Sequence, residues 1–126
     1  MVRKICLDTD ILVRIMRTDE GLKEFMSSLD ATFFTTTVNV FEIWQGHRQG
    51  EGTLELLSSL LKLDFDEKSA FAAGNIQRKL SDGGEILEFR DIFVAAVCVS
   101  NESELLTFNL KHFDVCTAES SLILCL

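Results

Sequence analysis

The chain has 126 residues, of which 47% are hydrophobic, so it can bury one continuous core and is not a disordered tail. The formal net charge is −8, which argues against a broad basic face for binding nucleic acid. No apolar run approaches the ~18 residues needed to span a bilayer, and no proline, repeat or linker-like stretch divides the chain. We therefore expect one domain over residues 1–126 and no association with a membrane.

The N-terminal apolar run is interrupted by Asp8, too early for the apolar region of a signal peptide, so we expect a cytoplasmic protein. The cysteines show no paired spacing and lie in apolar stretches, at Cys6, Cys98, Cys116 and Cys125. Such cysteines are typical of core packing in a reducing compartment. His47 and His112 are far apart in sequence, which argues against a histidine-built zinc site.

The first half of the chain alternates strand and helix signals. In chain order it predicts a buried strand over 2–7, a helix over about 10–17, an amphipathic helix carrying Leu22, Phe25, Met26 and Leu29, a strand over 32–36, and a helix capped by Thr36 and Thr37 that runs to about Gly46. Gly50 and Gly52 indicate a break after this helix.

The second half continues the alternation. It predicts an apolar helical stripe of Leu54, Leu57, Leu60 and Leu61, a weakly marked strand over 63–65, a helix over 67–81 stopped by Gly83 and Gly84, a buried helix over 90–99, and short strands over 104–107 and 115–117. The apolar tail over 122–126 is either an added edge strand or a surface for a partner. Strands that alternate with helices predict an α/β three-layer sandwich with a mostly parallel central sheet flanked by helices.

Polar residues follow the predicted strands where a parallel sheet binds ligands, at the carboxyl ends of its strands. Asp8 directly follows the first strand, and Asn109 follows the strand end at Thr107 by two residues. Glu42 lies in the helix after the second strand, among apolar neighbours, and Asp91 opens the buried helix. Taken singly, Asp8 could be a helix N-cap and Asp91 a first-turn acid that complements the helix dipole. Together they predict a cluster of oxygen ligands.

Carboxylates held close together repel one another unless a cation neutralises them, and hard oxygen ligands suit Mg²⁺ or Mn²⁺. Such an ion can polarise a phosphodiester and lower the pKa of a bound water. The cluster therefore predicts a metal-dependent nuclease. The three acids Asp8, Glu42 and Asp91 explain only part of the negative charge, because the chain would remain acidic without them.

Four segments, in order, resemble the motifs of PIN domains, especially those of VapC-type toxins. These segments are Ile5–Leu12, Thr36–Gly46, Arg90–Ala96 and Leu105–Phe113, and the resemblance extends over about residues 4–115. It implies a PIN-like fold and a Mg²⁺-dependent endoribonuclease that cleaves RNA, often as the toxin of a toxin–antitoxin pair and commonly as a homodimer. An antitoxin would then insert basic residues into the acidic crevice.

Carried over residue by residue, Asp8, Glu42 and Asp91 match the family's catalytic, metal-binding acids. Asn109 matches a fourth catalytic position that is often aspartate, so asparagine there weakens a second metal site and favours one firmly held ion. The supporting positions are Thr9, Asp10 and Thr107, whose side chains would orient carboxylates, water or phosphate.

Basic and aromatic residues near these motifs have simpler interpretations. The basic ones, which could form a rim around the acids but are by default solvated, are Arg14, Arg17, His47, Arg48, Lys111 and His112. The phenylalanines expected in the core are Phe25, Phe33, Phe34, Phe41, Phe71 and Phe93.

Two other functions fit parts of the pattern. Asp8 and Asp10 match the nucleophile motif of DxD-type phosphatases, but that chemistry needs a further acidic pair, and no Asp-Asp pair occurs in the chain. A catalytically silent PIN-like interaction domain is also compatible with Asn109 and with the acidic charge.

Overall fold

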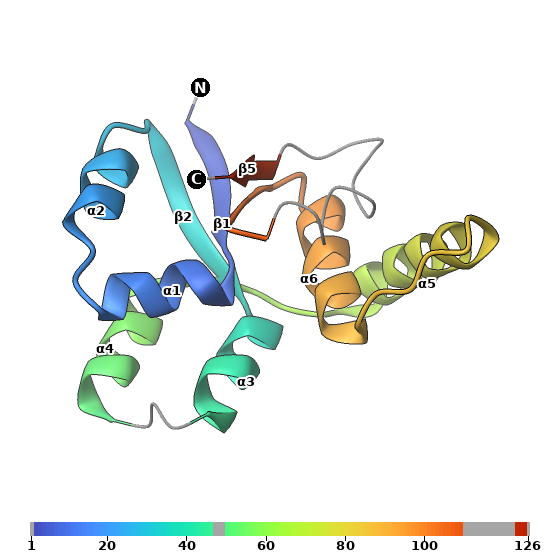
Figure 1. Ribbon diagram of the computed structural model, residues 1–126, viewed down its shortest axis with the longest axis horizontal. Coiled ribbons are helices and arrows are strands. Elements are labelled where there is room, and N and C mark those ends of the chain that lie inside the picture. Colours follow the sequence, from blue (N-terminus) through green and yellow to red (C-terminus); the bar gives the residue numbers. More distant parts are fainter. Residues whose placement is uncertain (1, 47–49, 110–122, 126) are drawn as a thin grey trace.

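The computed structural model describes residues 2–46 and 50–109 and the backbone of 123–125. The elements in chain order are β1 (Arg3–Leu7), α1 (Thr9–Met16), α2 (Glu20–Ser27), β2 (Ala31–Thr36), α3 (Thr37–Gln45), α4 (Glu51–Ser59), β3 (Leu61–Leu63), α5 (Glu67–Asp82), α6 (Phe89–Ser100), β4 (Glu104–Thr107) and β5 (Ile123–Cys125). Figure 1 shows the strands side by side with the helices around them.

The described strands form one parallel sheet in the order β3-β2-β1-β4-β5. β1 is central: Cys6 pairs with Phe34 of β2 and with Leu105 of β4. Because every strand runs in the same direction, their carboxyl ends meet at one edge of the sheet. The α/β sandwich with a parallel central sheet is therefore confirmed.

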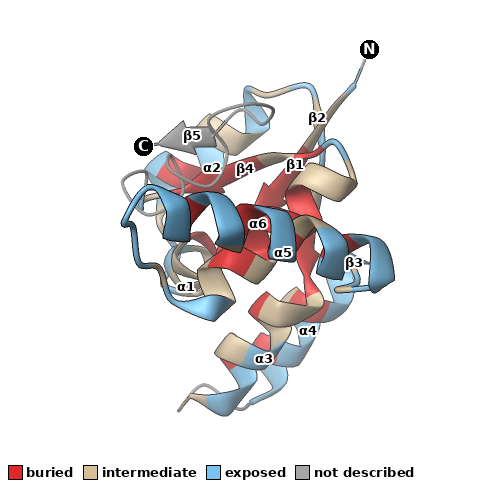
Figure 2. Ribbon diagram, turned by 90° about the vertical axis from the view of Figure 1, so that its right-hand side faces the viewer, coloured by how far each residue is buried: buried red, intermediate tan, exposed pale blue. Residues whose placement is uncertain are grey.

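Alternation along the strands divides the core between the two faces of the sheet. Cys6 and Leu105 pack with α5 and α6 on one face. Ile5, Leu7 and Leu106 pack on the other face with α1, α2 and α4 and with Ile43 of α3. Figure 2 shows buried residues on the strands and on α6, and exposed residues on the outer surface of α5.

Short polar side chains begin several helices where the sequence predicts a change of structure. Asp19 caps α2 and Asp66 caps α5, each accepting a hydrogen bond from a backbone N–H in the first turn. Thr36 caps α3 in a capping box with Asn39. The Thr36 cap places the start of α3 directly at the end of β2, near the predicted acids.

Two predicted boundaries are wrong. The third strand is Leu61–Leu63, not 63–65, because its register aligns Leu63 with Thr36 at the end of β2. Phe65 lies beyond the strand and packs its ring against Phe93, with ring centroids 4.6 Å apart. Gly52 does not interrupt the helical structure: it lies in the first turn of α4, which begins after Gly50.

Several predictions about burial also change. Cys6 and Cys98 are fully buried as expected, but Phe41 and Phe71 are exposed and do not belong to the core. The α2 stripe packs into the core as part of the cluster around Leu22. Of the two alternatives for the tail, the structure shows the edge strand: β5 pairs in parallel with β4. The strand predicted over 115–117 lies outside the described residues.

Within the described ranges, the helices are too short or too polar to cross a membrane.

We predict that Leu106→Ala lowers the free energy of unfolding by about 2–5 kcal/mol, because the Leu106 side chain is fully buried and leaves a cavity. Leu54→Ala is the matched control: the side chain is 51% exposed, and its loss should change stability by no more than about 0.5 kcal/mol. Urea denaturation followed by circular dichroism measures both. Equal losses in the two variants would contradict the described core.

Candidate active site

The carboxyl edge of the sheet brings together the ends of β1, β2 and β4. Asp8 follows β1 and is the N-cap of α1, Thr36 ends β2 and caps α3, and Thr107 ends β4. The Asp8 backbone N–H donates to the Leu106 carbonyl at 3.1 Å, which extends the pairing of β1 with β4 up to the site. Polar side chains from distant parts of the sequence therefore meet at this edge.

Asp8 is held from several sides and is only 6% exposed. Its Oδ1 accepts from the Thr9 backbone N–H at 2.9 Å and from Asn39 Nδ2 at 3.2 Å. Its Oδ2 accepts from the Thr107 hydroxyl at 2.8 Å. The carboxylate is thus fixed in orientation by residues of α1, α3 and β4.

Glu42 lies on α3, half-buried, and is connected to Asp8 through Thr9. The Thr9 hydroxyl donates to Glu42 Oε1 at 3.2 Å and accepts from Asn39 Nδ2 at 2.9 Å. Asp91, in the first turn of α6, is close enough for its charge to raise the pKa of Glu42. The three predicted metal-binding acids therefore approach the same edge from α1, α3 and α6.

Asp10 ties the chain after β4 to this edge. Its Oδ2 accepts from the Phe108 backbone N–H at 3.0 Å, and the Thr107 hydroxyl lies 3.4 Å away. Its Oδ1 is buried and has no hydrogen-bond partner among the described residues. A buried carboxylate oxygen without a donor is costly, and a cation would satisfy it.

Burial raises the pKa values of Asp8, Asp10 and Glu42, because the charged form of each carboxyl group loses contact with water. The pKa of Asp8 rises to about 7, chiefly by desolvation, with further increases from the charges of Asp10 and Glu42. Desolvation also raises the pKa values of Asp10 and Glu42. The site thus favours either protons or a cation over several free negative charges.

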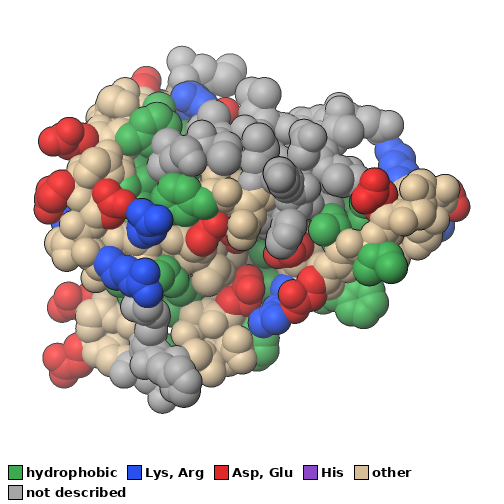
Figure 3. Space-filling view, viewed as in Figure 1, with side chains coloured by type: hydrophobic (Ala, Val, Ile, Leu, Met, Phe, Trp, Pro, Cys, Tyr) green, Lys and Arg blue, Asp and Glu red, His purple; other side chains and the backbone are tan. Residues whose placement is uncertain are grey.

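Two arginines stand beside the acids. Arg90 pairs with Glu88 through its Nε at 2.8 Å, and the charges of Glu42 and Asp91 also contribute to the raised pKa of the guanidinium. Arg14 lies over the Phe108 ring, with 4.9 Å between the guanidinium carbon and the ring centroid. Figure 3 shows acidic and basic side chains close together between α3 and α6.

Asn109 is the predicted site residue that the contacts place least firmly. It is exposed, and its backbone N–H donates to the Thr107 hydroxyl at 3.0 Å. Arg17 is exposed on the surface, whereas the other basic candidates, His47, Arg48, Lys111 and His112, lie outside the described residues.

Two further residues of the site, Asn39 and Arg90, are not among those that the sequence predicts. Asn39 is fully buried between Asp8, Thr9 and Thr36, and it precedes Glu42 by three residues, which puts both on one face of α3. That spacing, with a capping threonine before it, could have identified Asn39 as a neighbour of the acid. Arg90 immediately precedes Asp91, but its nearness to Glu42 depends on the packing of α3 against α6.

The donor set fits a hard divalent cation in kind, because every candidate ligand is a carboxylate oxygen and one buried oxygen of Asp10 is unsatisfied. The side chains are not yet gathered around one point: among the described residues, no three acidic, histidine or cysteine side chains are arranged to hold a metal. Binding would require these carboxylates to converge further.

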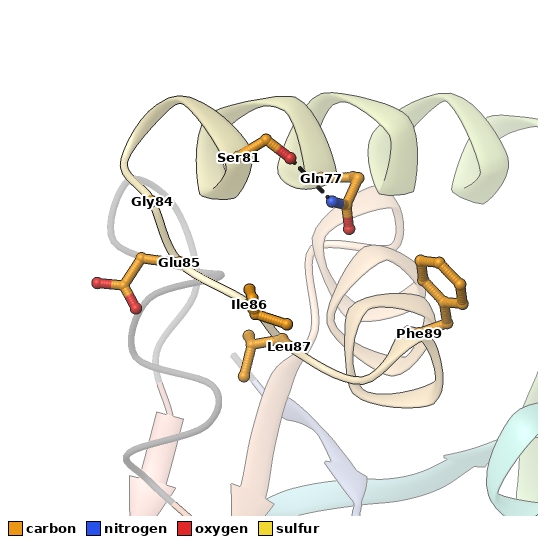
Figure 4. Close-up of a pocket in the computed structure, with 7 residues that line it drawn as sticks. All are labelled: Gln77, Ser81, Gly84, Glu85, Ile86, Leu87 and Phe89. Atoms are coloured by element: carbon orange, nitrogen blue, oxygen red, sulfur yellow. Dashed lines mark hydrogen bonds between the residues drawn. The ribbon is translucent and has the colours of Figure 1, made fainter.

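A hollow of about 430 Å³ lies elsewhere, at the end of α5. Figure 4 shows that α5, the loop after it and the start of α6 supply its lining, with Gln77 bonded to Ser81 at 3.0 Å and Glu85 pointing away from the other side chains. Because it has a single carboxylate, this hollow does not compete with the acidic edge as the candidate site.

We predict that the protein kept metal-free in EDTA becomes less stable as the pH rises from about 4 to 7. The pKa of Asp8 is about 7 in the folded state and 3.8 for the ordinary carboxyl group of the unfolded state. Between these two pH values the folded protein keeps a proton on Asp8 that the unfolded chain has released, so raising the pH favours unfolding. The full effect is about 4 kcal/mol at 1.36 kcal/mol per pKa unit. In Asp8→Asn this part of the decline should disappear when unfolding free energies are measured across the range. Parallel profiles for the two proteins would refute the assignment.

Comparison with known proteins gives a family match over most of the chain. Residues 5–117 match the PIN domain family. Ribonuclease VapC3 of Methanocaldococcus jannaschii is 34% identical over 92 residues, covering 72% of this chain and 94% of that protein. Ribonuclease VapC2 of Haemophilus influenzae is 30% identical over 120 residues, covering 88% of this chain and 90% of that protein.

Solved structures share the fold at low sequence identity. A chain of VapBC2 from Rickettsia felis, crystallised with a promoter DNA fragment, superposes with a TM-score of 0.83 at 19% identity over 98% of both chains. DNA-bound VapBC from Salmonella typhimurium gives a TM-score of 0.78 at 20% identity over 98% of this chain and 97% of that one. With the family match extending over most of the sequence, the chain belongs to the PIN domain family.

Proposed function

We propose that this protein is a Mg²⁺-dependent endoribonuclease and the toxin of a toxin–antitoxin pair. The observation that carries the proposal is the approach of Asp8, Glu42 and Asp91 to one edge of the sheet. The curated relatives at 30–34% identity are named as VapC ribonucleases, which supports RNA as the substrate class.

Asp8, Glu42 and Asp91 would hold the cation, with Asp10 as a further oxygen donor. Mg²⁺ or Mn²⁺ supplies neutralising charge, polarises the phosphodiester and lowers the pKa of an attacking water. Asn109 is neutral and exposed, so it adds little negative charge to a second metal position. The site therefore favours one ion over two.

The remaining residues position and balance these groups. Thr9 and Thr107 each donate a hydroxyl hydrogen to a carboxylate, so they fix which oxygens face the substrate. Arg90 offers a positive charge next to the acids, where it can contact a phosphate of the RNA backbone. A local positive charge of this kind helps an acidic chain to bind an anionic substrate.

The partner proposed for this edge is an antitoxin that inserts arginine or lysine between the carboxylates. Solved structures of the same fold include a member of the VapBC family of toxin–antitoxin systems from Mycobacterium tuberculosis and a toxin–antitoxin complex from Klebsiella pneumoniae. A chain with a net charge of −8 also favours a basic partner segment. The active protein would be a homodimer in the cytoplasm, where cellular RNA is translated.

Cleavage of RNA by wild type and Asp91→Asn tests the proposed activity. We expect the wild type to cleave with Mg²⁺ or Mn²⁺ and not with EDTA. Asp91→Asn should lower the rate by ~100-fold or more, since even partners outside the ligand shell cost 10–100-fold when removed. Rates come from cleavage of a labelled RNA resolved on a gel.

The control is Asp82→Asn, which removes an exposed carboxylate at the far end of α5 and should cleave like the wild type. Equal rates for wild type and Asp91→Asn would indicate a contaminating nuclease and reject the proposal. A folded wild type without any metal-dependent cleavage would favour the silent interaction domain.

A further inference from the structure

A fully buried amide connects two of the proposed catalytic acids. Asn39 has no exposed surface, although it lies in the first turn of α3 near the edge of the sheet. Burying an amide is costly unless its hydrogen-bonding groups are satisfied, so the partners of Asn39 reveal what its position requires.

The contacts of Asn39 determine which way its amide faces. Its Oδ1 accepts from the Thr36 hydroxyl at 2.7 Å and lies 3.3 Å from the Thr36 backbone nitrogen, whose N–H can only donate. Its Nδ2 lies 3.2 Å from the Asp8 carboxylate, which accepts when ionised. If the amide were flipped, its NH2 group would face the Thr36 N–H and its oxygen would face the Asp8 carboxylate. Only one orientation therefore gives hydrogen bonds on both sides.

From this orientation a directed chain of hydrogen bonds runs to both acids. One Nδ2 hydrogen goes to Asp8 Oδ1, and the other goes to Thr9 Oγ1 at 2.9 Å. Because the Thr9 hydroxyl then accepts from Asn39, its own hydrogen is free to go to Glu42 Oε1 at 3.2 Å. Both donors and both acceptor positions of the amide are used.

Capping of α3 requires only half of these contacts. The capping box uses the Asn39 backbone N–H, which donates to Thr36 Oγ1 at 3.1 Å, and the acceptor Oδ1 of the side chain. The two Nδ2 hydrogens contribute nothing to the cap, and both are directed toward the acids. A residue that served only to cap the helix would not need the side-chain NH2 group of Asn39.

We propose that Asn39 is a positioning residue that aligns Asp8 directly and Glu42 through the Thr9 hydroxyl. The inference rests on the proposed function, because it takes these two carboxylates as catalytic groups. Asn39 does not touch the substrate; it sets the direction of the carboxylate oxygens that do.

The substitution Asn39→Asp separates the two roles. It keeps the shape and the acceptor toward Thr36, and it replaces the donor group with a carboxylate oxygen facing Asp8 and Thr9. We expect kcat for RNA cleavage to fall by about 10–100-fold, as for the loss of other outer-shell partners, with KM for RNA changed by less than about twofold.

Thr9→Val should lower kcat in the same way, whereas Thr9→Ser keeps the hydroxyl and should restore kcat to within about threefold of the wild type.

Ser69→Ala is the matched control for loss of a buried polar group at the start of a helix. Ser69 is also fully buried and bonds to the capping Asp66 at the start of α5, away from the acids. It should lower the melting temperature and leave kcat unchanged. If Asn39→Asp and Thr9→Val also lower only the melting temperature, the positioning role is refuted.

A measurement without metal or RNA separates this inference from the proposed function. In a proton–nitrogen NMR spectrum of wild type in EDTA, the Asn39 side-chain amide hydrogens should exchange with water at least ~100-fold more slowly than those of exposed Asn75. Thr9→Val should shift one of the two Asn39 signals. Exchange as fast as that of Asn75 would overturn the hydrogen-bond chain whatever the activity, and slow exchange in a protein that does not cleave RNA would reject the nuclease proposal alone.

Discussion

The arrangement of the site depends on one buried carboxylate, that of Asp8 at the end of the central strand. Its two oxygens accept hydrogen bonds from α1, α3 and β4, so its position requires that β1 be flanked by β2 and β4. The same contacts connect Asp8 with Thr9 and Glu42. The central strand thus supplies both the middle of the core and the centre of the acidic edge.

Burying this group opposes stability at neutral pH. The pKa of Asp8 is raised to about 7, chiefly by desolvation and to a smaller extent by the neighbouring carboxyl groups of Asp10 and Glu42. The hydrogen bonds of Thr9 and Thr107 offset part of this effect. A site of this kind is incomplete electrostatically until a proton or a cation is added, which is the property that a metal-dependent reaction at a phosphodiester uses.

Much of the fold follows from the sequence because local patterns and burial agree along the strands and the long helices. The strand 104–107, the buried helix around Val94 and the cap at Thr36 lie where the apolar pattern and the capping residues predict. The third strand lies two residues before the predicted range, because its apolar pattern is short and its position depends on pairing with β2. Phe41 and Phe71 were expected in the core because hydrophobicity alone does not indicate which side of a helix is covered.

The acids could be recognised from their positions after strands and at helix starts, but their connections could not. Asn39 looks like an ordinary first-turn residue until β1 and α3 are placed side by side, when its amide reaches Asp8 and Thr9. The proximity of Arg90 to Glu42 likewise depends on the contact of α3 with α6. Long-range hydrogen bonds of this type depend on tertiary packing, which local sequence patterns do not contain.

The proposed function requires that Asp8, Glu42 and Asp91 form a site for a divalent cation. The most direct test is the melting temperature of wild type and Asp91→Asn with and without Mn²⁺, measured near pH 7.5. At ~100 times its dissociation constant, the ion stabilises the folded state by about 2.7 kcal/mol. For a chain of this length that corresponds to a rise on the order of 10 °C.

We expect such a rise for wild type and for the Asp82→Asn control, and little or none for Asp91→Asn. A wild-type melting temperature that stays the same at millimolar Mn²⁺ would contradict it.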